Sequence, residues 1–192
     1  MEKMKVALAT TNEEKAREVR AALSPFGIRI EHAALEMRES GTDQDAIARQ
    51  KARQAYKALK RPVIVEDTGV YFAGLDDFPG VLAKRVFLKI GFKGLLEKAA
   101  VARGRRAYFK TTLAYCNGKT IRTFEGTLHG TLTYDVDYAG YRKRPKLPYE
   151  AFFVPSGEKR RLCGISRREK AKFSHRAKAC RKFAKWFSKR IA

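Results

Sequence analysis

The sequence of 192 residues lacks several features that define whole classes of protein. Its only cysteines are Cys116, Cys163 and Cys180, with no close pair and no metal-type spacing, which indicates a reduced, cytoplasmic setting. No apolar stretch approaches the ~20 residues of a membrane span, and the run Val6 to Ala9 is too short for a signal peptide. Internal repeats and low-complexity linkers are also missing. We therefore predict a single domain over residues 1–192, without a membrane partner.

Acidic residues are scarce as well. The chain has 20 Asp and Glu against 42 Lys and Arg, a net charge of +22, and residues 157–192 hold 14 basic residues against two Glu, a surplus of 12. Such a field attracts polyanions such as nucleic acids, nucleotides or anionic membrane surfaces, but does not specify a fold. The 44% of hydrophobic residues predicts a folded protein and argues against a disordered basic tail.

The stretch from Pro62 to Gly69 combines a buried strand with acidic chemistry. Three consecutive β-branched residues after Pro62 are typical of a strand covered on both faces in a parallel sheet. Glu66 and Asp67 follow directly, and ligands of open α/β sheets bind at the carboxyl ends of strands. We expect Gly69 to let the chain turn away after them. The alternative is a polar turn or a helix cap, for which acidic residues are equally common.

A second candidate site lies near the N-terminus, between a strand expected over 5–10 and a helix expected over 13–26. Thr10, Thr11 and Asn12 are small and polar, and the N–H groups at a helix N-terminus bind phosphate oxygens. Lys15 in the first turn would add a point charge. A capping box formed by Thr11 and Glu14 explains the same residues without a ligand. The glycines of a Walker loop are missing.

A third acidic residue, Glu39, precedes a helix expected over 45–59. By itself it is typical of a solvated surface glutamate. If its loop folds over Glu66 and Asp67, three carboxylates converge, and such clusters hold hard divalent cations such as Mg²⁺.

The second half of the chain predicts a long antiparallel ribbon and a basic helix. Strands are expected over 106–116 and 120–136 around the hairpin signal Asn117-Gly118, a loop over 141–148 and a short strand over 149–155. Ser174 is expected to cap a helix running to about Arg190, with an apolar stripe and basic residues elsewhere. His175 and Arg176 fall in its first turn, where the helix dipole disfavours cations, so either a bound anion lies nearby or this is a solvated basic face.

These segments together resemble one family. Leu8-Ala9-Thr10-Thr11-Asn12-x-x-Lys15 is similar to the (S/T)GNxxK motif of the inosine triphosphate pyrophosphatases, the noncanonical purine nucleoside triphosphate pyrophosphatases, especially their archaeal members. Val65-Glu66-Asp67-Thr68-Gly69 resembles their (D/E)DSG, Phe78-Pro79-Gly80-Val81 their PG(V/I)YS, Glu169-Lys170 their EK and Ser174-His175-Arg176 their SHR. Each motif is short, but five in the family's order and spacing are specific.

The resemblance implies an α/β fold: a central mixed sheet flanked by helices, with two lobes around a deep cleft, usually in a homodimer. It also implies Mg²⁺-dependent hydrolysis of ITP, dITP or XTP to monophosphate and pyrophosphate. By position, Glu39 and Asp67 would hold the metal, and Asp67 would also be the catalytic group that orients or deprotonates the attacking water. The implied substrate-binding residues are Thr10, Thr11, Asn12 and Lys15 at the triphosphate, Thr68, Tyr149 and Glu150, and, at the 6-oxo edge of the purine, Lys170, His175 and Arg176.

The sequence also departs from the family pattern. Thr11 replaces a glycine, and the base-embracing GFGYD segment is replaced by Lys146-Leu147-Pro148-Tyr149-Glu150. Leu82-Ala83 and Cys163-Gly164-Ile165 replace two further motifs. The catalytic carboxylates are kept while the base pocket has changed. Two alternatives therefore stay open: a pyrophosphatase with shifted, Maf-like base specificity, and a degenerate homologue that binds nucleic acid through its basic C-terminal helix, with phosphate contacts and stacking on Phe173, Phe183, Trp186 and Phe187.

Overall fold

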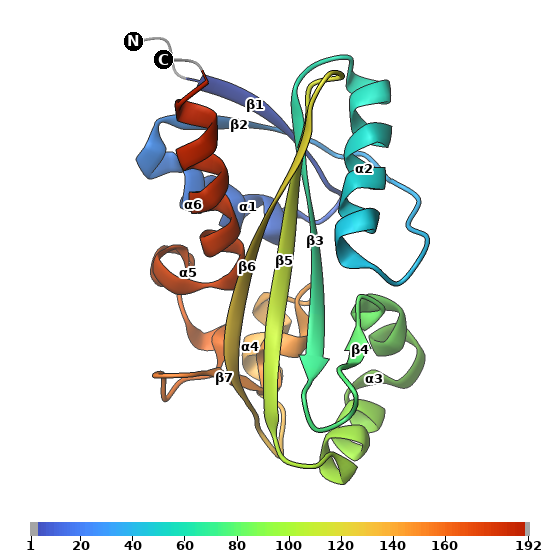
Figure 1. Ribbon diagram of the computed structural model, residues 1–192. Coiled ribbons are helices and arrows are strands. Elements are labelled where there is room, and N and C mark those ends of the chain that lie inside the picture. Colours follow the sequence, from blue (N-terminus) through green and yellow to red (C-terminus); the bar gives the residue numbers. More distant parts are fainter. Residues whose placement is uncertain (1–3, 191–192) are drawn as a thin grey trace. The chain divides into compact units, whose positions relative to one another are not determined.

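The computed structural model describes residues 4–190, which form two compact units (Figure 1). The first unit contains residues 4–67, 111–126 and 167–190, and the second contains 68–110 and 127–166. Three strands pass from one unit into the other: β3 (Val63–Phe72), β5 (Arg106–Cys116) and β6 (Ile121–Leu132). The prediction of one domain over residues 1–192 stays a prediction.

The first unit is built on strands in the order β2-β1-β3-β5-β6. β1 (Met4–Ala9) runs parallel to β2 (Ile28–Ala33), with Val6 opposite Ile30, and parallel to β3, with Leu8 opposite Ile64. The pairing of β6 with β7 (Phe153–Pro155) is antiparallel. The predicted α/β fold with a mixed central sheet is therefore confirmed.

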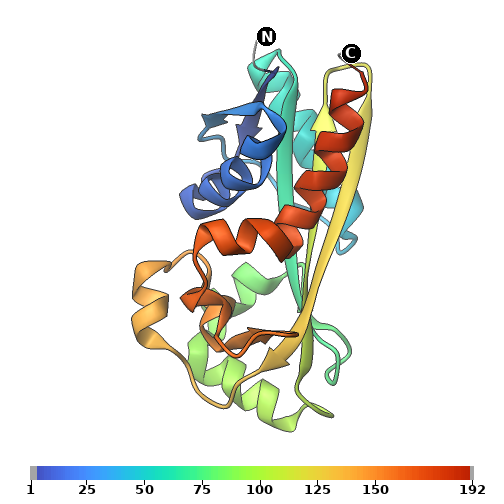
Figure 2. The same cartoon turned by 90° about the vertical axis from the view of Figure 1, so that its left-hand side faces the viewer.

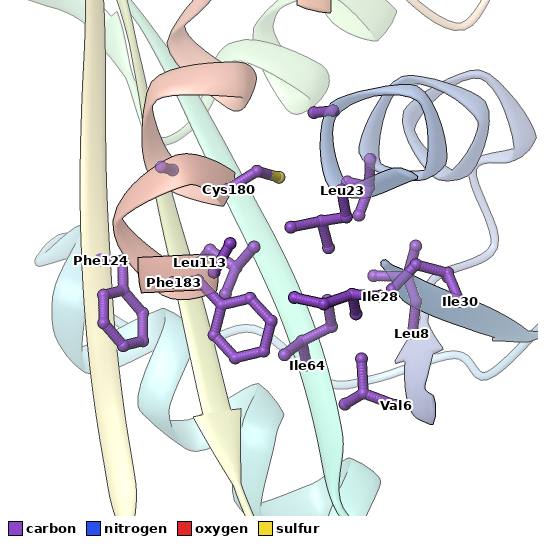
Figure 3. Packing of buried hydrophobic residues seen from close by; sticks show 14 of the residues in the cluster. Val6, Leu8, Leu23, Ile28, Ile30, Ile64, Leu113, Phe124, Cys180 and Phe183 are labelled. Carbon is purple, nitrogen blue, oxygen red and sulfur yellow. The ribbon is translucent and has the colours of Figure 1, made fainter. Parts of the chain in front are cut away.

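Helices cover both faces of this sheet because successive strand residues alternate between the faces. Val6, Leu8 and Ile64 pack with α1 (Glu13–Leu23) and α6 (His175–Ser188), whereas Ala7, Val63 and Val65 pack with α2 (Gln44–Leu59). Figure 3 shows the first of these cores, with Leu23 of α1 and Phe183 of α6 directed at the strand residues. The helix α5 (Arg167–Phe173) precedes α6.

The second unit combines the other halves of β3, β5 and β6 with short elements. β4 (Phe78–Gly80) pairs antiparallel with β3, and β7 pairs with β6. The helices and 3₁₀ turns are α3 (Ala83–Val101), α4 (Tyr138–Lys143), η2 (Pro148–Phe152) and η3 (Leu162–Gly164). Phe72, Phe87, Tyr149 and Phe152 form part of an aromatic core in this unit.

The structure corrects several expected boundaries. Gly69 does not turn the chain away, because β3 continues to Phe72, where its second half pairs with β4. The expected loop over 141–148 contains the end of α4, and the expected strand over 149–155 is mostly the 3₁₀ turn η2, with only the three residues of β7 extended. The helix expected over 13–26 ends at Leu23 and is followed by the 3₁₀ turn η1 (Ser24–Phe26). All three cysteines are free and buried.

Candidate active site

The two adjacent carboxylates of β3 face opposite sides of the sheet. Asp67 follows the alternation of Val63 and Val65 and lies on the face that α2 covers. Glu66 follows Ile64 and lies on the face that α1 and α6 cover. Both side chains are buried. Glu66 and Asp67 are adjacent in the sequence, but their side chains therefore contact two separate sets of partners.

On the α2 face, one lysine joins the two predicted metal ligands. Lys51 Nζ lies 2.8 Å from Glu39 Oε1 and 3.1 Å from Asp67 Oδ1. Gln44, which lies about two helical turns before Lys51 on the same face of α2, donates from Nε2 to the main-chain oxygen of Asp67 at 3.0 Å. The loop that carries Glu39 therefore does fold over Asp67. The ammonium group of Lys51 lies between the two carboxylates.

Burial and neighbouring charges shift the pKa values of Asp67 and Lys51 in opposite directions. Burial raises the pKa of Asp67 above its ordinary value, although the ammonium groups of Lys51 and Lys15 counteract it. Burial lowers the pKa of Lys51, but the carboxylates of Asp67 and Glu39 outweigh this effect, so that its pKa is raised. The second oxygen of Asp67, Oδ2, is buried and accepts no hydrogen bond from the described residues. A buried carboxylate oxygen without a donor is costly unless a ligand completes its coordination.

The predicted convergence of three carboxylates is wrong for Glu66. Among residues 4–190 no group of three or more His, Cys, Asp or Glu side chains is arranged to hold a metal. The reason is the period of two along β3, which turns Glu66 away from the side that Asp67 occupies. Any cation at this site has two protein carboxylates at most.

On the opposite face, Glu66 belongs to a chain of buried ion pairs. Lys15 Nζ lies 2.5 Å from Glu66 Oε1, and Arg176 Nε lies 3.3 Å from Glu66 Oε2. Arg176 also bonds Glu18 through Nη1, and Lys170 Nζ lies 2.9 Å from the other oxygen of Glu18. The chain links Lys15, at the predicted phosphate end, to Lys170 and Arg176, at the predicted base end.

Charges of opposite sign alternate along this chain of ion pairs. Burial alone would raise the pKa of Glu18, but Arg176 and Lys170 lower it to about 2. His175 and Arg176 are each only 1% exposed, so the alternative of a solvated basic face is wrong for them, and Lys170 is equally buried. The first turn of α6 faces α1 and β3. There the carboxylates of Glu18 and Glu66 bind Arg176 and offset the unfavourable position of this cation at the start of a helix.

His175 is buried beside the same pairs. Burial and the neighbouring Arg176 lower the pKa of its imidazole well below the usual value, so the ring is neutral at neutral pH. A neutral imidazole has one donor and one acceptor nitrogen. Gly126 of β6 allows this packing: a Cβ there would lie 2.1 Å from the His175 carbonyl oxygen. Figure 2 shows α6 lying beside β6.

The loop between β1 and α1 is ordered by its own side chains. Asn12 caps α1, its Oδ1 accepting from the N–H groups of Glu14 and Lys15, and Thr10 Oγ1 accepts from the Asn12 N–H. The capping box of Thr11 and Glu14 is therefore wrong, because Asn12 stands one position nearer to the helix and Glu14 pairs with Arg17 and Arg167 instead. The loop keeps Lys15 directed at Glu66.

Three predicted substrate residues belong to the second unit. Tyr149 is buried and donates from Oη to the Ala83 carbonyl oxygen at 2.8 Å, while Glu150 is buried with Arg144 Nη1 at 3.7 Å. Thr68 is the first residue of that unit and is partly exposed. Their contact with a substrate stays a prediction.

Lys51, Gln44 and Glu18 belong to the site although no sequence motif predicted them. Lys51 had a detectable signal: with Gln44, Ala48 and Ala55 it follows the helical period, so a lysine stood on the apolar face of α2. Glu18 had a weaker one, since it lies one turn after Glu14 beside the apolar stripe of α1. Neither signal identifies a partner, because the partners come from the loop before α2, from β3, from α5 and from α6.

Comparison with known proteins identifies the family of this chain. The model of the Ham1 family matches residues 6–186. The chain is 36% identical over 191 residues to the dITP/XTP pyrophosphatase of Hyperthermus butylicus, covering 97% of this chain and 96% of the relative. It is 35% identical over 184 residues to the dITP/XTP pyrophosphatase of Saccharolobus solfataricus, covering 95% and 93%.

A solved structure shares the fold. The HAM1 protein from Coxiella burnetii superposes with a TM-score of 0.79 at 22% identity, covering 97% of this chain and 99% of that protein. The resemblance inferred from the five motifs is confirmed, and the motif order reflects relationship along nearly the whole chain. This protein belongs to the Ham1 family.

Proposed function

We propose that the chain hydrolyses noncanonical purine nucleoside triphosphates, namely ITP, dITP and XTP, to the monophosphate and pyrophosphate with Mg²⁺. The observation that carries the proposal is the buried Asp67, which shares Lys51 with Glu39 and has its Oδ2 without a donor in the described chain. The names of its relatives, dITP/XTP pyrophosphatases over nearly their full length, point to the same reaction.

The donor set fits Mg²⁺. This ion is commonly bound by one or two carboxylates together with substrate phosphates and water, and Glu39 and Asp67 supply two. The site also needs additional positive charge, because Lys15, Lys51, Lys170 and Arg176 are each already paired with a carboxylate. When bound, the metal would neutralise phosphate charge and polarise a phosphoryl oxygen.

Other side chains of the site have separate roles in this proposal. Asp67 orients or deprotonates the attacking water through its second oxygen, Oδ2, and Lys15 with the start of α1 binds the triphosphate. Neutral His175 donates one hydrogen bond, and Arg176 and Lys170 are held by Glu18 as further donors. A 6-oxo group accepts such hydrogen bonds, whereas the amino group of adenine would leave buried donors unpaired.

A substrate panel tests this proposal. Pyrophosphate release with Mg²⁺ should be about 100-fold faster, as kcat/KM, for ITP and XTP than for ATP. The measurement covers ITP, XTP, dITP, GTP, ATP, UTP and CTP. Preference for a pyrimidine nucleotide would favour the Maf-like alternative, and no release from any substrate would refute hydrolysis as the function.

Metal binding can be tested without turnover through Lys51. Changing Lys51→Met leaves Asp67 buried without its cation, so without metal the free energy of unfolding should fall by about 3 kcal/mol. Mg²⁺ binding only to the native state should recover part of this loss. The wild type should gain less, because its Lys51 ammonium group already pairs with both carboxylates and repels a second cation.

Denaturant unfolding with and without Mg²⁺ measures both free energies of unfolding. Lys57→Met, at an exposed position of the same helix, is the matched control. It should change neither the free energy of unfolding without metal nor its increase with Mg²⁺. Equal stabilisation of the wild type and of Lys51→Met by Mg²⁺ would place the metal elsewhere than between Glu39 and Asp67.

The remaining predictions concern setting and partners. Within residues 4–190 no helix is both long and apolar enough to span a membrane. A cytoplasmic setting, a homodimer and non-specific contact with nucleic acid through the basic C-terminal helix stay predictions.

A further inference from the structure

Four lysines form a straight line along the outer side of α6. Lys178, Lys182, Lys185 and Lys189, the α6 lysine line, are spaced four, three and four residues apart, which places them on one narrow face of a helix. The line is about 16 Å long at 1.5 Å per residue. It lies on the outer side of the helix whose first turn carries the buried His175 and Arg176.

Three of these four lysines have no carboxylate partner in the part of the chain that the structure describes. Lys182, Lys185 and Lys189 are exposed, and no carboxylate of residues 4–190 lies within ion-pair distance of their ammonium groups. Residues 170–190 contain no Asp or Glu. Like charges four residues apart on a helix repel each other, so an external anion would relieve repulsion along the line.

The cationic surface continues from α6 onto the neighbouring strand. Trp186 is partly buried, and the guanidinium groups of Arg122 on β6 and Arg190 lie 5.4 and 4.8 Å from its ring centroid. Both arginines are exposed. The ring itself is surrounded by Tyr115, Phe124 and these cations.

This packing excludes base stacking by the aromatic residues of α6. Phe183 and Phe187 are buried in the core with Cys180, and the faces of Trp186 are occupied by its neighbours. The stacking that the sequence suggested is therefore wrong for Phe183 and Phe187, because the helix turns them inward. The line therefore offers ammonium groups that suit phosphate oxygens, and no stacking surface from Phe183 or Phe187.

The same burial argues against a lipid surface. Membrane-bound amphipathic helices insert an apolar face, and that face of α6 packs in the core. The exposed large hydrophobic residues of the described chain are Leu82, Leu88, Val101, Tyr134 and Tyr138, none of them on α6. A linear polyanion fits a linear array of lysines better than a bilayer does.

We propose that the α6 lysine line, extended by Arg122 and Arg190, binds the phosphate backbone of nucleic acids without base specificity. This is a surface separate from the proposed nucleotide site and does not depend on hydrolysis. Each phosphate contact releases condensed counterions, so the affinity should fall steeply with salt.

Fluorescence anisotropy with labelled RNA, single-stranded DNA and duplex DNA of about 20 nucleotides or base pairs, over roughly 50 to 200 mM salt, measures this binding. The triple variant Lys182→Gln/Lys185→Gln/Lys189→Gln should bind at least about tenfold more weakly at the lowest salt. For the duplex, its slope of log affinity against log salt should be smaller by about three. Each single variant should lower that slope by about one.

The matched control removes the same charge from another helix. Lys84→Gln/Lys89→Gln/Lys93→Gln changes three exposed lysines of α3 and should keep most of the wild-type affinity. Wild-type affinity in the α6 variants, or equal losses in both triple variants, would overturn the proposal, the second by showing an effect of net charge alone. Binding to anionic lipid vesicles with the same lysine dependence, but not to nucleic acid, would also overturn it.

Two readouts separate this proposal from the proposed hydrolysis. The α6 triple variant should keep wild-type pyrophosphate release, since its lysines lie outside the catalytic group. Asp67→Asn should keep wild-type nucleic-acid affinity. A loss of nucleic-acid binding in Asp67→Asn would mean that the polyanion enters the nucleotide site, and the α6 lysine line would have no such role.

Discussion

Replacing Asp67 by asparagine should lower kcat for ITP by about 10³-fold, because the variant loses both a general base and a carboxylate ligand. The amide keeps the size of the side chain and can still contact Lys51 Nζ, so the packing between β3 and α2 is retained. Burial already raises the pKa of Asp67, which means that its ionised form is destabilised by its surroundings. Thermal unfolding should therefore show no large loss of stability.

The matched control is Asp43→Asn. Asp43 caps α2 through its carboxylate, and asparagine caps helices about as well as aspartate does. This variant removes a carboxylate close to the site without touching Lys51, so its kcat should remain within about twofold of the wild type. Full hydrolysis by Asp67→Asn would show that the catalytic assignment is wrong, whatever the substrate preference.

Replacing Glu18 by glutamine should have the largest effect on stability. Glu18 is buried and pairs with both Arg176 and Lys170, so the change removes the carboxylate that these two buried cations share, and Arg176 keeps its pair with Glu66. Breaking a buried ion pair costs about 3–5 kcal/mol, a large part of the stability of a typical domain. Denaturant unfolding at neutral pH measures the difference.

The pH dependence of stability tests the same group. The pKa of Glu18 is lowered from 4.5 to about 2 in the folded chain. The unfolded chain therefore binds this proton more tightly, and the stabilisation is fully present above pH 4.5 and lost as the pH falls towards 2. The shift corresponds to about 3 kcal/mol. Glu18→Gln should remove this part of the acid-induced loss.

Glu14→Gln is the control on the same helix, one turn earlier. Glu14 pairs with Arg17 and Arg167, whose side chains are 48% and 40% exposed, and such partly solvated pairs contribute about 1 kcal/mol or less. Equal losses for Glu14→Gln and Glu18→Gln would show that the buried pairs of Glu18 have no special role.

The sequence by itself determined those features that depend on local pattern. The helix over 44–59, the hairpin at Asn117-Gly118 and the capped helix after Ser174 follow from helical period, turn chemistry and capping. The family also follows from the sequence, because five motifs keep their order along the chain. Each helix, cap, turn and motif is recognised from residues within a few positions of each other, and the family from the order of the motifs along the chain.

Only the tertiary structure decided which charges meet. Whether Glu66 and Asp67 act together depended on the length of β3, and that strand continues through both residues because its far end pairs with β4. Whether His175 and Arg176 face water depended on Glu18 and Glu66 lying opposite them. Lys51 likewise pairs with Glu39 and Asp67 because the fold brings the loop before α2 and the strand β3 to it. A buried charge is stable only beside its partner, and these partners come from segments distant in the sequence.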